Sequence, residues 1–265
     1  MSRIAEKILE LKNKRKKAFL AYITAGFPKP NDTLDIVKQL EKDGVDIVEL
    51  GMPFSDPIAD GATIQKASGV ALKQGMNLKK FLNLVKILRS QTQIPLIIMS
   101  YYNPIFNYGI KNFAKDAKDA GLDGVIIPDL PPEESTDLNR NLKLKGIDQI
   151  FLISPVTPAE RMQKIAKSTR GFVYYVSLTG VTGMRKSLAS GLSGKLKILK
   201  KITDHKIFVG FGIFRIKQVK DVLKQADGVI IGSAIIKILQ SYKSKKQRLK
   251  QLSRYVQSIN KVTFF

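Results

Sequence analysis

The sequence contains no cysteine and a single histidine, and both shortages restrict its chemistry. Without cysteine the chain has no disulfide, no thiolate nucleophile and no thiolate ligand for a metal. One histidine, His205, also rules out a metal site built from several histidines. Because His205 stands just before the apolar run that begins at Ile207, we interpret it as a strand-entry residue.

Long hydrophobic runs are lacking as well. No apolar run approaches the roughly 18 residues of a membrane span. Glu6 and Glu10 interrupt the basic residues near the N-terminus, and no cleavage site follows an apolar segment there, so we predict neither a signal peptide nor a transit peptide. We expect no membrane association, and a cytoplasmic location or, for a plastid-encoded chain, the plastid stroma.

Acidic residues are scarce relative to basic ones. The 45 Lys and Arg residues against 22 Asp and Glu give a formal net charge of +23, which raises the question of nucleic-acid binding. The lysines are spread over helical patterns, and no aromatic residues are interleaved to stack on bases. We therefore predict no nucleic-acid partner and keep a basic nucleic-acid-binding barrel as a remote alternative. The densest basic run, predicted to be the solvated face of a last helix, consists of Lys243, Lys245, Lys246, Arg248 and Lys250.

Short apolar runs alternate with longer amphipathic segments along the whole chain. Eight runs are nearly continuous in apolar character, as strands buried on both faces must be. Helical spacing between them includes residues 34–40, which end at Gly44, and residues 113–120, which end at Gly121. Residues 157–160 form a Thr-Pro-Ala-Glu sequence that predicts a capping box. The predicted strands are 19–24, 46–50, 95–99, 124–127, 149–153, 172–176, 207–210 and 228–231.

Eight strands that alternate with helices predict an α/β fold with a parallel sheet. A doubly wound sheet can also hold eight strands. The length of 265 residues and the reactive side chains after several separate strands favour a TIM (β/α)8 barrel, here a single domain over 1–265. An extra N-terminal helix from Ser2 to about Arg15, with Ile4, Ile8 and Leu11 on one side, is expected to cover the bottom of the barrel.

The second predicted strand carries an acid. Glu49 lies between Val48 and Leu50, and an acid buried among apolar residues is costly and has a raised pKa. The following loop adds Asp56 and Asp60. Two carboxylates in different environments are the usual groups for acid–base chemistry at neutral pH. A salt-bridged structural role for Glu49 and a turn-fixing role for Asp56 remain the alternatives.

Glycine-rich segments follow the last three predicted strands, at 177–183, 210–213 and 232–235. Glycine lets backbone N–H groups approach an anion, and barrels often bind phosphate after strands seven and eight. These loops therefore predict a phosphate site. The small residues of 178–191 also predict a mobile lid.

The run from Glu49 to Gly61 (ELGMPFSDPIADG) closely resembles the signature of tryptophan synthase alpha chains. The resemblance continues in order through residues 24–28, 102–104, 128–131, 154–158, 180–183 and 210–212, and so covers nearly the whole chain.

This resemblance implies a TIM barrel that cleaves indole-3-glycerol phosphate to indole and glyceraldehyde 3-phosphate, without a metal or organic cofactor. It also implies an α2β2 complex with a tryptophan synthase beta subunit; a free-standing indole-3-glycerol-phosphate lyase is the alternative. Glu49 and Asp60 match the catalytic carboxylates. The positions that match substrate-binding residues are Tyr22, Tyr174, Thr182, Gly183, Phe211, Gly212, Gly232 and Ser233. The positions in loops that face the beta subunit are Pro53, Asp56, Asn103 and Phe106.

Overall fold

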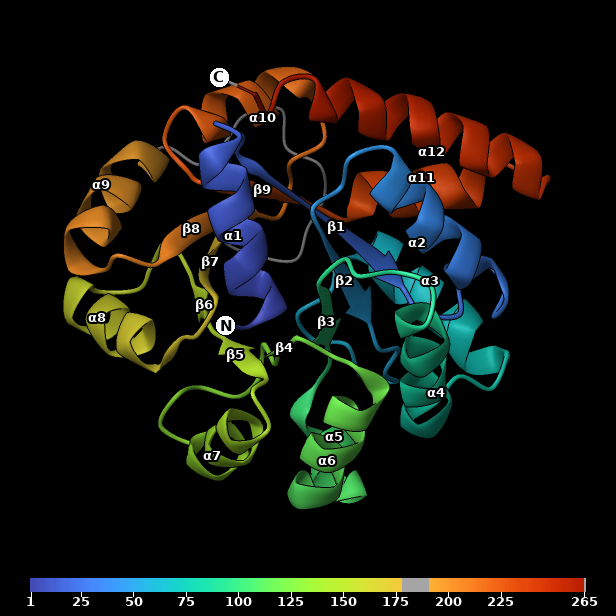
Figure 1. The fold of residues 1–265 in the computed structure, drawn as a ribbon, viewed down its shortest axis with the longest axis horizontal. Helices are drawn as coiled ribbons and strands as arrows, with labels where there is room; N and C mark the ends of the chain where they lie inside the picture. The colour runs from blue at the N-terminus through green and yellow to red at the C-terminus, as the bar shows by residue number, and fades with distance from the viewer. Residues whose placement is uncertain (178–190, 265) are drawn as a thin grey trace.

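The computed structural model describes residues 1–177 and 191–264. Parallel strands form the wall of a barrel with helices around it (Figure 1). The strands are β1 (Ala18–Thr24), β2 (Ile47–Gly51), β3 (Leu96–Met99), β4 (Gly124–Ile126), β5 (Asp148–Ile150), β6 (Leu152–Ile153), β7 (Phe172–Val176), β8 (Lys206–Gly210) and β9 (Gly228–Ile231). All eight predicted strands are confirmed.

The predicted strand at 149–153 occurs as two short strands, β5 and β6, separated by Phe151. They stand at opposite ends of the sheet order β5-β4-β3-β2-β1-β9-β8-β7-β6, so the barrel closes where the chain passes through Phe151. Two backbone bonds join this segment to the β7 side: the Arg170 N–H donates to the Gln149 carbonyl at 2.9 Å, and the Tyr174 N–H to the Phe151 carbonyl at 3.3 Å. The predicted TIM barrel is confirmed.

Helices surround the sheet because their apolar stripes bury against it while their charged faces remain in solvent. They are α1 (Arg3–Asn13), α2 (Asp32–Lys42), α3 (Ala62–Lys73), α4 (Leu78–Arg89), α5 (Tyr102–Tyr108), α6 (Ile110–Ala120), α7 (Thr136–Leu144), α8 (Ala159–Ser168), α9 (Leu192–Ile202), α10 (Ile216–Leu223), α11 (Ser233–Ser241) and α12 (Lys245–Asn260). None of these helices within the described residues is long and apolar enough to cross a membrane.

The predicted extra helix, α1, lies across one opening of the barrel (Figure 1). Ser2 donates a hydrogen bond to Asp148 at 2.6 Å, and Arg3 pairs with Asp123 at 2.9 Å. Both acceptors stand where strands begin, so α1 covers the amino-terminal end. Ile4 is fully buried there, and a Cβ placed on Gly124 would lie only 3.0 Å from its Cδ1. The opposite, carboxyl-terminal end is left for a site.

Two local predictions are wrong. Thr157 does not cap α8: Pro158 is the N-cap residue, and the Thr157 hydroxyl oxygen instead accepts the Ser154 N–H at 3.1 Å. Arg248 is not on a solvated face. It is buried and donates to Asp32 at 2.7 Å, which ties α12 to α2.

Breaking this pair is expected to destabilise the fold. The Arg248 and Asp32 side chains are each 8% exposed, so Arg248→Met leaves a buried carboxylate without its main partner. Removal of one member of a buried ion pair costs about 3–5 kcal/mol. Urea unfolding should show this loss for Arg248→Met and not for the exposed control Lys250→Met. A further Asp32→Leu change should recover stability; equal stability of Arg248→Met and wild type would contradict the assignment.

Candidate active site

Glu49 projects from β2 into the carboxyl-terminal half of the barrel. Strand register places it beside Tyr22 of β1 and Ile97 of β3. Its side chain lines the cavity at this end, while the neighbours Val48 and Leu50 point the other way because side chains alternate along a strand. Glu49 is 1% exposed, and its Oε2 has no hydrogen-bond partner among the described residues. A salt-bridged structural role is therefore excluded within the described part of the chain.

Burial separates the two acids electrostatically. Loss of solvent raises the pKa of Glu49 to about 8, and the nearby charge of Asp60 adds to the rise. Burial also raises the pKa of Asp60, to about 6, and the neighbouring Tyr101 hydroxyl partly offsets this effect. At neutral pH, Glu49 is therefore mostly protonated and Asp60 mostly ionised. One cavity thus holds a proton donor and an anion.

The loop between β2 and α3 holds Asp60 in place. The Asp60 N–H donates to the Pro57 carbonyl at 3.0 Å, and the Gln65 amide donates to the Asp60 carbonyl at 2.9 Å. Tyr101, which follows β3, also holds this loop, because its hydroxyl oxygen accepts the Ala59 N–H at 2.9 Å. A loop tied at both sides of residue 60 keeps the carboxylate aimed at the cavity.

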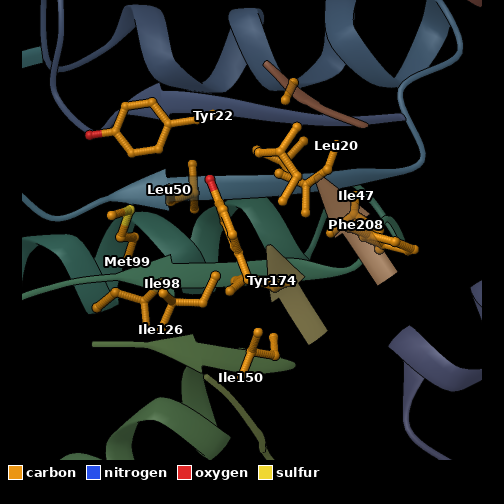
Figure 2. Packing of buried hydrophobic residues seen from close by; sticks show 14 of the residues in the cluster. Leu20, Tyr22, Ile47, Leu50, Ile98, Met99, Ile126, Ile150, Tyr174 and Phe208 are labelled. Atoms are coloured by element: carbon orange, nitrogen blue, oxygen red, sulfur yellow. The ribbon is translucent and has the colours of Figure 1, made fainter. Parts of the chain in front are cut away.

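Two tyrosines, Tyr22 of β1 and Tyr174 of β7, line the cavity. Figure 2 shows Tyr22 and Met99 toward the carboxyl ends of the strands, and Leu20, Ile47 and Phe208 farther toward the amino ends. The Tyr22 ring reaches over Gly51, and the Tyr174 ring over Gly210; a Cβ on either glycine would collide with the tyrosine hydroxyl. Burial raises the pKa of both phenols well above the ordinary value, so both stay neutral.

The loop after β8 forms another side of the cavity. Phe211 and Gly212 both have positive φ, of 69° and 70°, which turns the chain sharply. The Ser177 hydroxyl donates to the Phe211 carbonyl. The buried Gln218 of α10 holds the rest of the loop, since its Oε1 accepts the N–H groups of Phe214 and Arg215 at 3.2 and 3.0 Å.

The loop after β9 leads directly into α11. Gly232 is the N-cap residue, and its carbonyl accepts the Ile236 N–H at 3.0 Å, so the helix begins at Ser233. The N–H groups of a first helical turn have no partner within the helix and carry the positive end of its dipole. Gly232 also lies against Tyr22: a Cβ there would come within 3.2 Å of the Tyr22 Cβ. This end of the cavity is suited to an anion.

The cavity has a volume of about 160 Å³, many times the roughly 10–15 Å³ that one water needs. It is therefore large enough to admit a small ligand. Its lining residues include all the predicted substrate and catalytic positions within the described residues: Tyr22, Glu49, Asp60, Tyr174, Phe211, Gly212, Gly232 and Ser233. Thr182, Gly183 and residues 178–190 of the predicted lid lie outside the described residues.

Three kinds of contribution to this pocket have no local signal in the sequence. Tyr101 follows a strand end, but its link to residue 59 is not local. Lys237 has no feature in the sequence that distinguishes it from the many other lysines. The apolar lining residues Ile64 and Met99 carry no chemical signal of their own. Within the described residues, no group of three or more His, Asp or Glu side chains is arranged to hold a metal.

Of the predicted partner-facing residues, Pro53 and Asp56 lie in the loop between β2 and α3, but Asn103 and Phe106 lie in the helix α5 and not in a loop, so the prediction of a loop is wrong for these two. Asp56 and Asn103 are exposed, and Phe106 is 60% exposed. Ile58, in the same loop as Asp56, is 73% exposed. Pro53 is buried and therefore supports this loop from inside.

Residues 8–263 match the sequence profile of the family described as Tryptophan synthase alpha chain. The chain belongs to this family. The tryptophan synthase alpha chain of Geotalea uraniireducens (strain Rf4) is 46% identical over 248 residues, which cover 94% of this chain and 93% of that protein. The alpha chain of Geobacter sulfurreducens is 45% identical over 242 residues, 91% of this chain and 92% of the relative.

Solved structures extend the family relationship to the fold. The tryptophan synthase alpha subunit of Legionella pneumophila str. Paris superposes with a TM-score of 0.90 at 38% identity, covering 99% of this chain and 98% of the other. A chain in the structure of Mycobacterium tuberculosis tryptophan synthase gives a TM-score of 0.90 at 30% identity, covering 100% and 99%. The predicted family is confirmed over nearly the full length.

Proposed function

We propose that the protein cleaves indole-3-glycerol phosphate to indole and glyceraldehyde 3-phosphate, as the alpha subunit of a tryptophan synthase. The observation that carries this proposal is the pair of buried carboxylates, Glu49 and Asp60, that line one cavity. Membership of the tryptophan synthase alpha chain family supports the substrate. An assay for indole release from indole-3-glycerol phosphate tests it directly.

Glu49 is the proton-transfer group in this proposal. Its acid form protonates indole C3 and becomes a carboxylate. That carboxylate then removes the proton from the side-chain hydroxyl next to C3. The C–C bond breaks, its electrons return to the indole ring, and the hydroxyl carbon becomes the aldehyde. Glu49 ends as it began, so the cycle needs no added proton or oxidant.

Asp60 is the stabilising anion. When C3 is protonated, positive charge develops on the indole ring and makes its N–H more acidic. A carboxylate held at the N–H lowers the energy of this state more than that of bound substrate, which is the requirement for catalysis. Tyr101 keeps Asp60 ionised near neutral pH, since its hydroxyl opposes the effect of burial.

Activity should depend on pH in both directions. Asp60 must be ionised and Glu49 protonated, so kcat/KM for indole release is expected to fall below about pH 6 and above about pH 8. Because the two acids interact, the two limbs of the pH profile give apparent pKa values that belong to the pair and not to either acid alone. A profile from pH 5 to 9.5 at constant ionic strength checks this. A flat profile across both values would contradict the assignment.

The phosphate group is assigned to the N–H groups around Gly212, Gly232 and Ser233. These lie at the end of the cavity with the start of α11. A crystal grown with sulfate or phosphate is expected to show the anion bonded to those N–H groups. N–H groups turned away from the anion, or an anion elsewhere, would contradict this part of the proposal.

We further propose that the chain works in an α2β2 complex with a beta subunit that receives indole. The exposed residues Asp56, Ile58, Asn103 and Phe106 near the cavity mouth are the proposed contact surface. Indole release measured with and without a beta subunit distinguishes this assignment from a free-standing lyase: strong activation and co-purification support the complex. Fractionation of the host cell tests the expected cytoplasmic or stromal location.

A further inference from the structure

Lys237 lines the same cavity as the two carboxylates. It lies on α11, four residues after Ser233. Residues four apart share one face of a helix, and helical side chains lean toward the N-terminus. The Lys237 side chain is therefore directed from α11 back over the helix start, which is the end of the cavity formed by Gly232 and Ser233.

The charges of the cavity give this lysine a distinct role. Among the described lining residues, Lys237 is the sole lysine or arginine, and the acids are Glu49 and Asp60. A phosphate monoester carries about −1.5 to −2 charges at pH 7, whereas a helix start supplies roughly +0.5. Since Asp60 is mostly ionised, a phosphorylated substrate brings like charge into the pocket. Glycine N–H groups alone leave much of that charge unbalanced.

Independent of α11, Glu49 marks the pocket as a ligand site. Its buried Oε2, without a hydrogen-bond partner among the described residues, faces the cavity. Gly232 packs against Tyr22, which is the neighbour of Glu49 in the strand register. A ligand that contacts Glu49 can therefore extend to the start of α11.

We propose that Lys237 is a further substrate-binding residue that neutralises the phosphate and so selects a phosphorylated substrate. This inference rests on the proposed function. Lysine acts as a flexible point charge and not as a geometric clamp. Lys237 is exposed, so contact with a phosphate at the mouth does not require the whole lysine to be buried.

The test compares Lys237→Met and Lys237→Arg with wild type for indole release. Loss of a charge-assisted bond should raise KM for indole-3-glycerol phosphate roughly ten-fold or more, with kcat within a few-fold. KM should also depend less steeply on salt. Lys237→Arg should restore most of the affinity, and cleavage of indole-glycerol without phosphate should be unaffected by Lys237→Met. Inorganic phosphate should inhibit Lys237→Met less strongly than wild type.

The matched control is Lys217→Met. Lys217 is exposed on α10, near the loop after β8, but does not line the cavity, so it tests the general effect of one positive charge. Should wild type release no indole, the proposed function fails. Should wild type be active while Lys237→Met keeps its KM, salt dependence and phosphate inhibition, or changes them no more than Lys217→Met, this inference is overturned.

Discussion

Replacement of Glu49 by glutamine is expected to lower kcat for indole release by at least about 10²–10⁴-fold, the usual contribution of general acid–base catalysis. Glutamine keeps the size of the side chain but can neither give a proton to C3 nor take one from the hydroxyl. KM should change little, because the amide still fits the cavity. Steady-state assays with indole detection, together with single-turnover measurements, check the loss in the chemical step.

The same variant should be at least as stable as wild type. The pKa of Glu49 is about 8 in the folded chain against 4.5 as the ordinary value, so folding takes up a proton. A raised pKa contributes stability that is fully present below about pH 4.5 and is lost as pH rises through about 8. At pH 7 the proton uptake lowers the folding stability by on the order of 3 kcal/mol relative to low pH, and glutamine avoids part of this loss. Thermal melts should therefore favour Glu49→Gln increasingly from pH 6 to about 8, and the difference should level off above that pH.

The control for this pair of results is Glu134→Gln, an exposed acid in the turn before α7. It should change neither kcat nor the melting temperature. Near-normal kcat in Glu49→Gln, or a chain that no longer folds, would return Glu49 to a structural role.

Asp60→Asn is the second large effect that we expect. It removes the anion proposed to stabilise the protonated indole ring, so kcat should fall by about 10²–10³-fold, as when a preorganised electrostatic group is lost. The pH profile of the remaining activity should also change. Because the Asp60 charge raises the pKa of Glu49, the alkaline limb of the pH profile should move to lower pH in the variant, and the acid limb should disappear.

Asp56→Asn is the matched control, since it lies in the same loop but is exposed. It should leave the uncomplexed reaction nearly unchanged and should mainly reduce activation by a beta subunit. Equal losses in both aspartate variants without a beta subunit would indicate that the loop, and not the Asp60 charge, is responsible.

Local sequence patterns predicted most of the barrel. Each strand is a compact apolar run, and the order of runs and helices determined the parallel topology. Glycine at 121 ends α6 in the left-handed conformation, as the pattern indicated. The two wrong predictions have different causes. The Thr157 hydroxyl oxygen accepts a local N–H, that of Ser154, whereas Arg248 is buried by its pair with Asp32, which is far away in the sequence.

The site shows the same division. Glu49 and Asp60 were predictable because an acid in a buried strand and a following acidic loop are conspicuous. The break of the fifth strand at Phe151, the support of residue 59 by Tyr101 and the lining by Lys237 depend on contacts between separate βα units. No pattern within one unit carries that information.

The contacts of Tyr22 with Gly51 and of Tyr174 with Gly210 also constrain how this protein can evolve. A side chain larger than hydrogen at either glycine would meet the ring atoms of the tyrosine, and not its hydroxyl alone. A change of tyrosine to phenylalanine is therefore no preparation for Gly51→Ala or Gly210→Ala. A residue smaller than tyrosine or phenylalanine removes the clash, so substitution of the tyrosine has to precede substitution of the glycine. A mutational path that begins at either glycine therefore starts with a steric clash against the tyrosine ring.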